Sequence, residues 1–138
     1  MSNSDFLEKT KFKLGDIIFH EGDDGDAAYM VTKGEVEIRL GLHGENPRTL
    51  TKIQKGGTFG ELALCLDSPR TASAIATEDT ELIKVSRDDL LRILEETNPI
   101  VKTLMLNLGK RVIDITEELE IGSNEINWHQ WERKEEYK

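Results

Sequence analysis

The chain has 138 residues, of which 37% are hydrophobic and 33% are charged, and its net charge is −9 at pH 7. This length suits one domain with its own core, and so acidic a chain does not favour a nucleic-acid-binding surface, which needs clustered Lys and Arg. No apolar run approaches the roughly 18 residues of a membrane span, and residues 1–5 lack the basic and apolar parts of a signal peptide. The single cysteine, Cys65, lies in an apolar run, so we expect a buried thiol in a cytoplasmic protein.

The first two thirds of the chain are predicted to be mostly β-structure. Residues 4–10 fit a short helix or a capped turn. Short β-like runs separated by glycine and polar turns follow, and they predict strands at 17–20, 29–32, 36–40, 49–53, 71–77 and 81–85, with a hairpin connection around 44–47. Several short strands at close spacing indicate a sandwich, a barrel or a jelly roll.

After residue 85 the hydrophobic pattern changes to a helical period. Ser86 and the acidic residues after it predict a helix start, with leucines on its apolar side. Pro99 suits the first turn of a second helix. Along that helix, apolar residues recur every three or four positions, at Ile100, Leu104, Leu108, Val112, Ile115 and Leu119. We expect one long amphipathic helix ending near residue 122, whose apolar face fits either a homodimer seam or packing on the β part.

The segment from Phe59 to Ala74 carries the chemistry of a phosphate site. Gly60 lets backbone approach a ligand closely, and residues 61–64 favour a helix whose first amides would face an anion. Nine positions after Glu61, Arg70 supplies a permanently charged fork suited to phosphate oxygens. Because Arg70 lies among small, weakly polar residues at the expected start of a strand, its charge needs a partner.

Each part of this segment also has a purely structural interpretation. Thr58 and Glu61 have the spacing of a capping box, in which they would satisfy the first amides of a helix. Pro69 fits an ordinary turn, and Arg70 taken alone fits a solvated surface arginine. The combination of all these parts in one short segment favours the phosphate site.

The segment from Phe59 to Ala74 resembles the phosphate-binding cassette of the cyclic-nucleotide-binding domain family, found in kinase regulatory subunits, nucleotide-gated channels and bacterial transcription regulators. The family pattern is Phe-Gly-Glu-Leu/Ile-Ala, a variable stretch and then Arg-Thr/Ala/Ser-Ala, at the spacing seen here. Residues 22–31 and 34–38 are similar to the family's first hairpin signature, and the resemblance extends over residues 10–120. With the short N-terminal helix, the expected fold is α+β: an antiparallel, jelly-roll-like β-roll followed by a C-terminal helical hairpin.

The resemblance implies a role for each residue of the cassette. Arg70 would pair with an equatorial oxygen of the cyclic phosphate. Glu61 would accept a hydrogen bond from the ribose 2′-hydroxyl, a donor that suits a carboxylate. The backbone amides of Gly60, Leu62 and Ala63 would face the phosphate and the sugar.

The sequence specifies recognition of the base less fully than recognition of the phosphate and the sugar. Thr71 would add a hydroxyl and an amide, and relatives with threonine here include proteins that prefer cyclic AMP and others that prefer cyclic GMP. Cyclic AMP is favoured here only by its frequency in the family. Arg111 fits either a contact with the base or a solvated arginine. Trp128 or Trp131, in the polar tail 123–138 beyond the main domain 1–122, fits either a cap on the base or part of a frayed helix.

Other site chemistries lack the spacing that they need. The run from Asp23 to Asp26 lacks the glutamate of an EF-hand and fits a β-turn instead. Residues 56–60 lack the Gly-Lys-Ser/Thr ending of a P-loop. His20, His43 and His129 are scattered without metal-ligand spacing. We therefore expect no enzyme, no metal and no cofactor besides a nucleotide ligand.

The sequence thus predicts a regulatory sensor that binds a cyclic nucleotide, with the long helix closing over the ligand and signalling to an effector protein or domain. Two alternatives remain: a constitutive interaction domain with an unused pocket, or a piece of a larger cyclic-nucleotide-regulated protein. Intact Glu61 and Arg70 weigh against the first alternative.

Overall fold

The computed structural model describes residues 6–121, with side-chain burial defined up to residue 115. The chain divides into two compact units, residues 1–97 and residues 98–138. The first contains all the strands of the described part, one short helix and one α-helix, whereas the second contains the long helix α2 (Pro99–Ile121).

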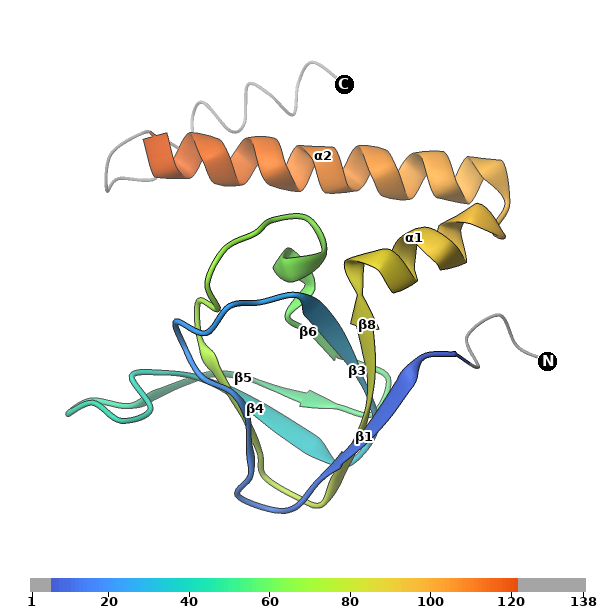
Figure 1. Cartoon of the computed structure of the whole chain (residues 1–138). Helices are drawn as coiled ribbons and strands as arrows, with labels where there is room; N and C mark the ends of the chain where they lie inside the picture. Colours follow the sequence, from blue (N-terminus) through green and yellow to red (C-terminus); the bar gives the residue numbers. More distant parts are fainter. Residues whose placement is uncertain (1–5, 122–138) are drawn as a thin grey trace. The chain divides into compact units, whose positions relative to one another are not determined.

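The described part of the first unit is built from eight strands and two short helices. In chain order, they are β1 (Glu8–Phe12), β2 (Ile17–Phe19), β3 (Ala27–Lys33), β4 (Glu35–Leu40), β5 (Arg48–Gln54), β6 (Thr58–Phe59), the 3₁₀ helix η1 (Glu61–Leu64), β7 (Ser73–Ala76), β8 (Thr80–Ser86) and α1 (Arg87–Glu95). The strands form two four-stranded sheets, in the orders β1-β8-β3-β6 and β2-β7-β4-β5, and their pairings are antiparallel (Figure 1). The predicted antiparallel β-roll is confirmed.

The core of the roll lies between the two sheets. Its centre is a cluster of five apolar side chains, one from each of five strands: Val31, Val36, Phe59, Ala74 and Leu82. These residues are almost fully buried, as expected for inward positions of strands that alternate between two faces. The buried ring of Phe59 therefore fixes the backbone immediately before Gly60 and η1.

The helix predicted within residues 4–10 is wrong over the described residues, because residues 8–10 belong to strand β1, whereas residues 4 and 5 lie outside the described part of the chain. Residues 8–12 pair antiparallel with β8, from Glu8 opposite Lys84 to Phe12 opposite Thr80. Glu and Lys are good helix formers, but their intrinsic preference is worth only tenths of a kcal/mol per residue. Pairing with β8 at the edge of the sheet outweighs it, and charged side chains suit an edge strand.

The predicted helix starts after the β-roll are confirmed. Ser86 is the N-cap of α1: its hydroxyl accepts from the amide of Asp89 at 3.0 Å, and the carboxylate of Asp89 accepts from the amide of Ser86 at 3.0 Å. In α2, the side chain of Asn98 accepts from the amide of Ile100 at 2.8 Å. Neither α1 nor α2, over the residues described, is long and apolar enough to span a membrane.

Candidate functional site

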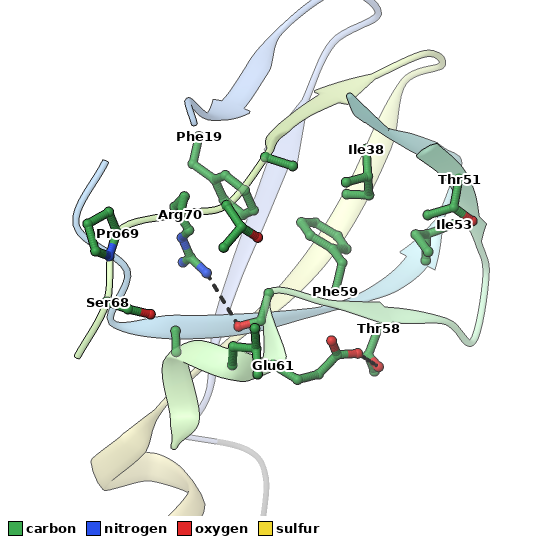
Figure 2. Close-up of a pocket in the computed structure, with 15 residues that line it drawn as sticks. Phe19, Ile38, Thr51, Ile53, Thr58, Phe59, Glu61, Ser68, Pro69 and Arg70 are labelled. Carbon is green, nitrogen blue, oxygen red and sulfur yellow. Dashed lines mark hydrogen bonds between the residues drawn. The ribbon is translucent and has the colours of Figure 1, made fainter. Parts of the chain in front are cut away.

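A cavity of about 250 Å³ lies beside η1 in the first unit (Figure 2). The six residues predicted from the sequence line this cavity: Gly60, Glu61, Leu62, Ala63, Arg70 and Thr71. Ala63 is buried, whereas Glu61, Leu62 and Thr71 are exposed. Gly60, the short helix η1 and the loop before β7 thus converge on one concave surface.

Gly60 adopts a conformation that few other residues could take. Its φ is 74°, in the left-handed region, and it is the N-cap of η1. A Cβ built on it would lie 2.7 Å from Nη1 of Arg70. Glycine is therefore favoured by the backbone turn, and a Cβ at this position would displace the guanidinium.

The capping-box interpretation of Thr58 and Glu61 is wrong. Thr58 belongs to strand β6, and its hydroxyl donates a hydrogen bond to the carboxylate of Glu61 instead of capping a backbone amide. The predicted helix is a single 3₁₀ turn, in which the amide of Ala63 donates to the carbonyl of Gly60 at 3.2 Å. The Ala63 amide, predicted to face a ligand, is therefore already engaged in this structure.

Arg70 is held by backbone and aromatic groups rather than by a carboxylate hydrogen bond. Nη2 donates to the carbonyl of Ala27 at 2.7 Å. Nη1 donates to the carbonyl of Gly60 at 3.3 Å, the bond drawn as a dashed line in Figure 2. Its Cζ lies 4.1 Å from the centre of the Phe19 ring, within the range of a cation–π contact. The guanidinium plane is thus fixed at the wall of the cavity.

The charge of Arg70 is incompletely satisfied. Its Nε is buried and has no hydrogen-bond partner among residues 6–121. Burial lowers the pKa of the guanidinium, while nearby Tyr29, Asp26 and Asp23 act in the opposite direction. A half-buried cation with an unused donor is costly unless an anion binds beside it.

The acidic turn before β3 fixes the backbone of Arg70. The amide of Arg70 donates to the carbonyl of Asp23 at 2.7 Å, and the amide of Gly22 donates to the carbonyl of Arg70 at 2.8 Å. A Cβ on Gly25 would lie 3.0 Å from Nε of Arg70. The sequence predicted a β-turn from Asp23 to Asp26 but did not indicate that this segment holds Arg70. Within residues 6–121, no group of three or more His, Cys, Asp or Glu side chains is arranged to hold a metal ion.

Arg87 ties the end of η1 to the start of α1. Its Nη2 donates to the carbonyl of Ala63 at 3.1 Å and to the carboxylate of Asp67 at 3.0 Å, and its Nε donates to the carbonyl of Leu64 at 3.2 Å. Arginine is well suited to donate several hydrogen bonds at once because its donors form a rigid fork. Sequence reasoning missed this residue, since nothing local distinguishes it from a solvated helix arginine.

The side of the cavity away from Arg70 is largely apolar and was also missed. Ile38 of β4 and Ile53 of β5 line it together with Thr51 and Phe59 (Figure 2). The alternation of the two strands contained this signal, because residues two apart point to one face of a sheet. The cavity therefore joins a cationic end to an apolar end, as a ligand with a phosphate and a flat ring would require.

The sequence also singled out a cysteine, an arginine of the long helix and two tryptophans. Cys65 is half-buried rather than buried, and it is a free cysteine. Arg111 lies on α2, in the second unit, and is exposed. Trp128 and Trp131 lie outside the described residues, as does the whole tail from 123 to 138.

Comparison with known proteins places the chain in a family. The family "Cyclic nucleotide-binding domain" matches residues 9–97, which include η1, α1 and all of the two sheets except Glu8. The chain therefore belongs to the cyclic nucleotide-binding domain family.

The relatives include both bacterial and eukaryotic regulators. The chain is 33% identical to the cyclic AMP receptor protein of Thermus thermophilus over 120 residues, which cover 87% of this chain and 56% of that protein. It is 42% identical to the cAMP-dependent protein kinase regulatory subunit of Hypocrea atroviridis over 91 residues, which cover 66% of this chain and 19% of that one. The chain thus spans about half of the first relative and a fifth of the second.

Solved structures have the same fold. The half-site-occupied form of the EAL enzyme Bd1971 aligns with a TM-score of 0.74 and 36% identity, covering 78% of this chain and 96% of that chain. The cAMP-bound form of the same enzyme aligns with a TM-score of 0.60 and 33% identity, covering 83% of this chain but only 31% of that one. The Thermus thermophilus catabolite activator protein aligns with a TM-score of 0.66 and 32% identity, covering 88% and 57% of the two chains.

Proposed function

We propose that the chain senses a cyclic nucleotide, with cyclic AMP preferred over cyclic GMP, and that it acts as a regulatory module rather than as an enzyme. The observation that carries the proposal is that Arg70 is a half-buried cation with a donor left unpaired among residues 6–121. This cation is half-buried at the wall of the cavity, with Nε unpaired among the described residues and the left-handed turn at Gly60 beside it. A cyclic phosphodiester carries one negative charge, so one arginine is enough to neutralise it.

The other end of the cavity supports the same class of ligand. Glu61 also lines the cavity, and its carboxylate can accept a hydrogen bond from a ribose hydroxyl. Ile38 and Ile53 offer an apolar surface for a purine. The names of relatives that mention cAMP support cyclic AMP, although one solved neighbour is a cGMP-bound form. Thr71 lines the cavity and is compatible with either base.

Thermal unfolding with and without each nucleotide tests the proposal directly. A ligand at about 100 times its dissociation constant adds about 2.7 kcal/mol to the free energy of unfolding. We therefore expect cyclic AMP to raise the melting temperature by several degrees, and cyclic GMP to raise it less at equal concentration. The non-cyclic nucleotide 5′-AMP is the control. No shift with either cyclic nucleotide at millimolar concentration would refute the proposal.

We also propose that α2 responds to the ligand by closing over it and that this movement is read by an effector protein or domain, or by a second copy of the chain. The support is the family's known order of a β-roll followed by a helix that closes it. Such a switch requires the ligand to bind one helix position more tightly than the other. We expect the amides of α2 to exchange hydrogen more slowly when cyclic AMP is bound, as followed by mass spectrometry. Protection confined to residues 58–72 would contradict a role for α2.

A further inference from the structure

The contact between Thr58 and Glu61 is not accounted for by helix capping. The hydroxyl of Thr58 donates to Oε1 of Glu61, and both side chains line the cavity (Figure 2). In β6, Thr58 pairs with Met30 of β3, so its backbone is held by the sheet rather than by η1. The strand therefore supplies a fixed hydroxyl to a carboxylate that belongs to the next element.

This contact uses only part of the hydrogen-bonding capacity of Glu61. A carboxylate has two oxygens and about four lone-pair sites, and Thr58 occupies one of them. The second oxygen, Oε2, remains able to accept from a ligand hydroxyl. Thr58 thus does not compete with a ligand for the whole carboxylate.

The contact also limits the freedom of an exposed side chain. Glu61 is exposed, and a glutamate side chain loses much conformational entropy when a ligand orders it. Threonine is stiff at χ1 because it is branched at Cβ, and its strand position restricts it further. A hydrogen bond from such a donor holds Glu61 in place before the ligand arrives, which reduces the entropic cost of binding.

We propose that Thr58 is a positioning residue: it holds the carboxylate of Glu61 so that the second oxygen accepts the ribose 2′-hydroxyl. The inference rests on the proposed binding of a cyclic ribonucleotide. It assigns to Thr58 a share in discrimination between ribose and deoxyribose, although Thr58 itself need not touch the sugar.

The test compares dissociation constants for cyclic AMP and 2′-deoxy cyclic AMP by calorimetry in four proteins. The wild type is expected to prefer the ribonucleotide by about tenfold or more, because its hydroxyl donates to a charged acceptor. Thr58→Val keeps the shape but removes the donor, and should reduce this preference by roughly three- to tenfold while affinity for the deoxy ligand stays the same. Thr58→Ser restores the hydroxyl and should keep the preference. Thr51→Val removes another hydroxyl from the cavity wall and should change both affinities by the same factor.

A double-mutant cycle tests whether Thr58 affects the preference for ribose through Glu61. In a Glu61→Gln background, Thr58→Val should have little further effect on the preference, since the two residues act together. Equal weakening of both ligands by Thr58→Val would overturn the positioning role. A wild type that binds both ligands equally well would overturn it too, while leaving the proposed function intact. Binding of neither ligand would overturn the proposed function and this inference with it.

Discussion

Replacement of Arg70 by lysine is expected to weaken cyclic-nucleotide binding by about a hundredfold, or roughly 3 kcal/mol. Lysine keeps the positive charge but lacks the planar fork that reaches Ala27 and Gly60 and stacks on Phe19. Without those contacts the ammonium is neither held at the cavity wall nor able to offer two parallel donors to a phosphate. Titration calorimetry with cyclic AMP measures the loss.

The matched control for this substitution is Arg48→Lys. Arg48 is exposed at the start of β5 and does not line the cavity, so the same change of chemistry there should leave the dissociation constant unaltered. Ligand-free Arg70→Lys should remain folded, because the buried, unpaired Nε of Arg70 is itself unfavourable for stability. An Arg70→Lys protein that binds within threefold of the wild type would refute the phosphate role.

The parts of the site that could be predicted are those encoded within one short segment. Gly60, Glu61 and Arg70 stand at fixed separations in one loop and helix turn, so local chemistry and a family pattern were enough to select them. The β-roll was predictable for a related reason, since apolar and polar residues alternate along residues 36–40 and 49–53, as expected of strands.

The parts that were missed depend on partners far away in the sequence. Strand β1 exists because β8 offers it an edge, and the contacts of Arg87 exist because η1 ends beside α1. Glu37 is a further case: an acidic residue on an alternating strand suggests exposure, yet it is buried. The hydroxyl of Thr49, on the neighbouring strand, donates to its carboxylate at 2.9 Å, and this hydrogen bond lowers the pKa of Glu37. Tertiary pairing in each instance outweighs the local preference.

Replacement of Gly34 by alanine should destabilise the ligand-free fold by about 3–4 kcal/mol, the sum of left-handed backbone strain and overpacking. Gly34 joins β3 to β4 with a φ of 90°. A Cβ there would lie 2.4 Å from the carbonyl oxygen of Asp79 and 2.5 Å from Oγ1 of Thr80. Thr80 is buried, and its hydroxyl lies 3.1 Å from the carbonyl oxygen of Glu35 and 2.9 Å from that of Glu78. Neither the backbone nor this side chain can move away cheaply.

Gly15→Ala separates the two contributions to this loss. Gly15 has almost the same φ, 92°, but a Cβ built on it meets nothing within 4 Å. It should therefore cost only the backbone strain, about 1 kcal/mol, and lower the melting temperature by a few degrees, whereas Gly34→Ala should lower it by about 12–24 °C. Urea unfolding with unchanged m-values would show that both losses arise in the native state. Equal losses from the two substitutions would mean that the Thr80 contact does not limit Gly34, because the two glycines share almost the same φ but differ in the space around the added methyl group.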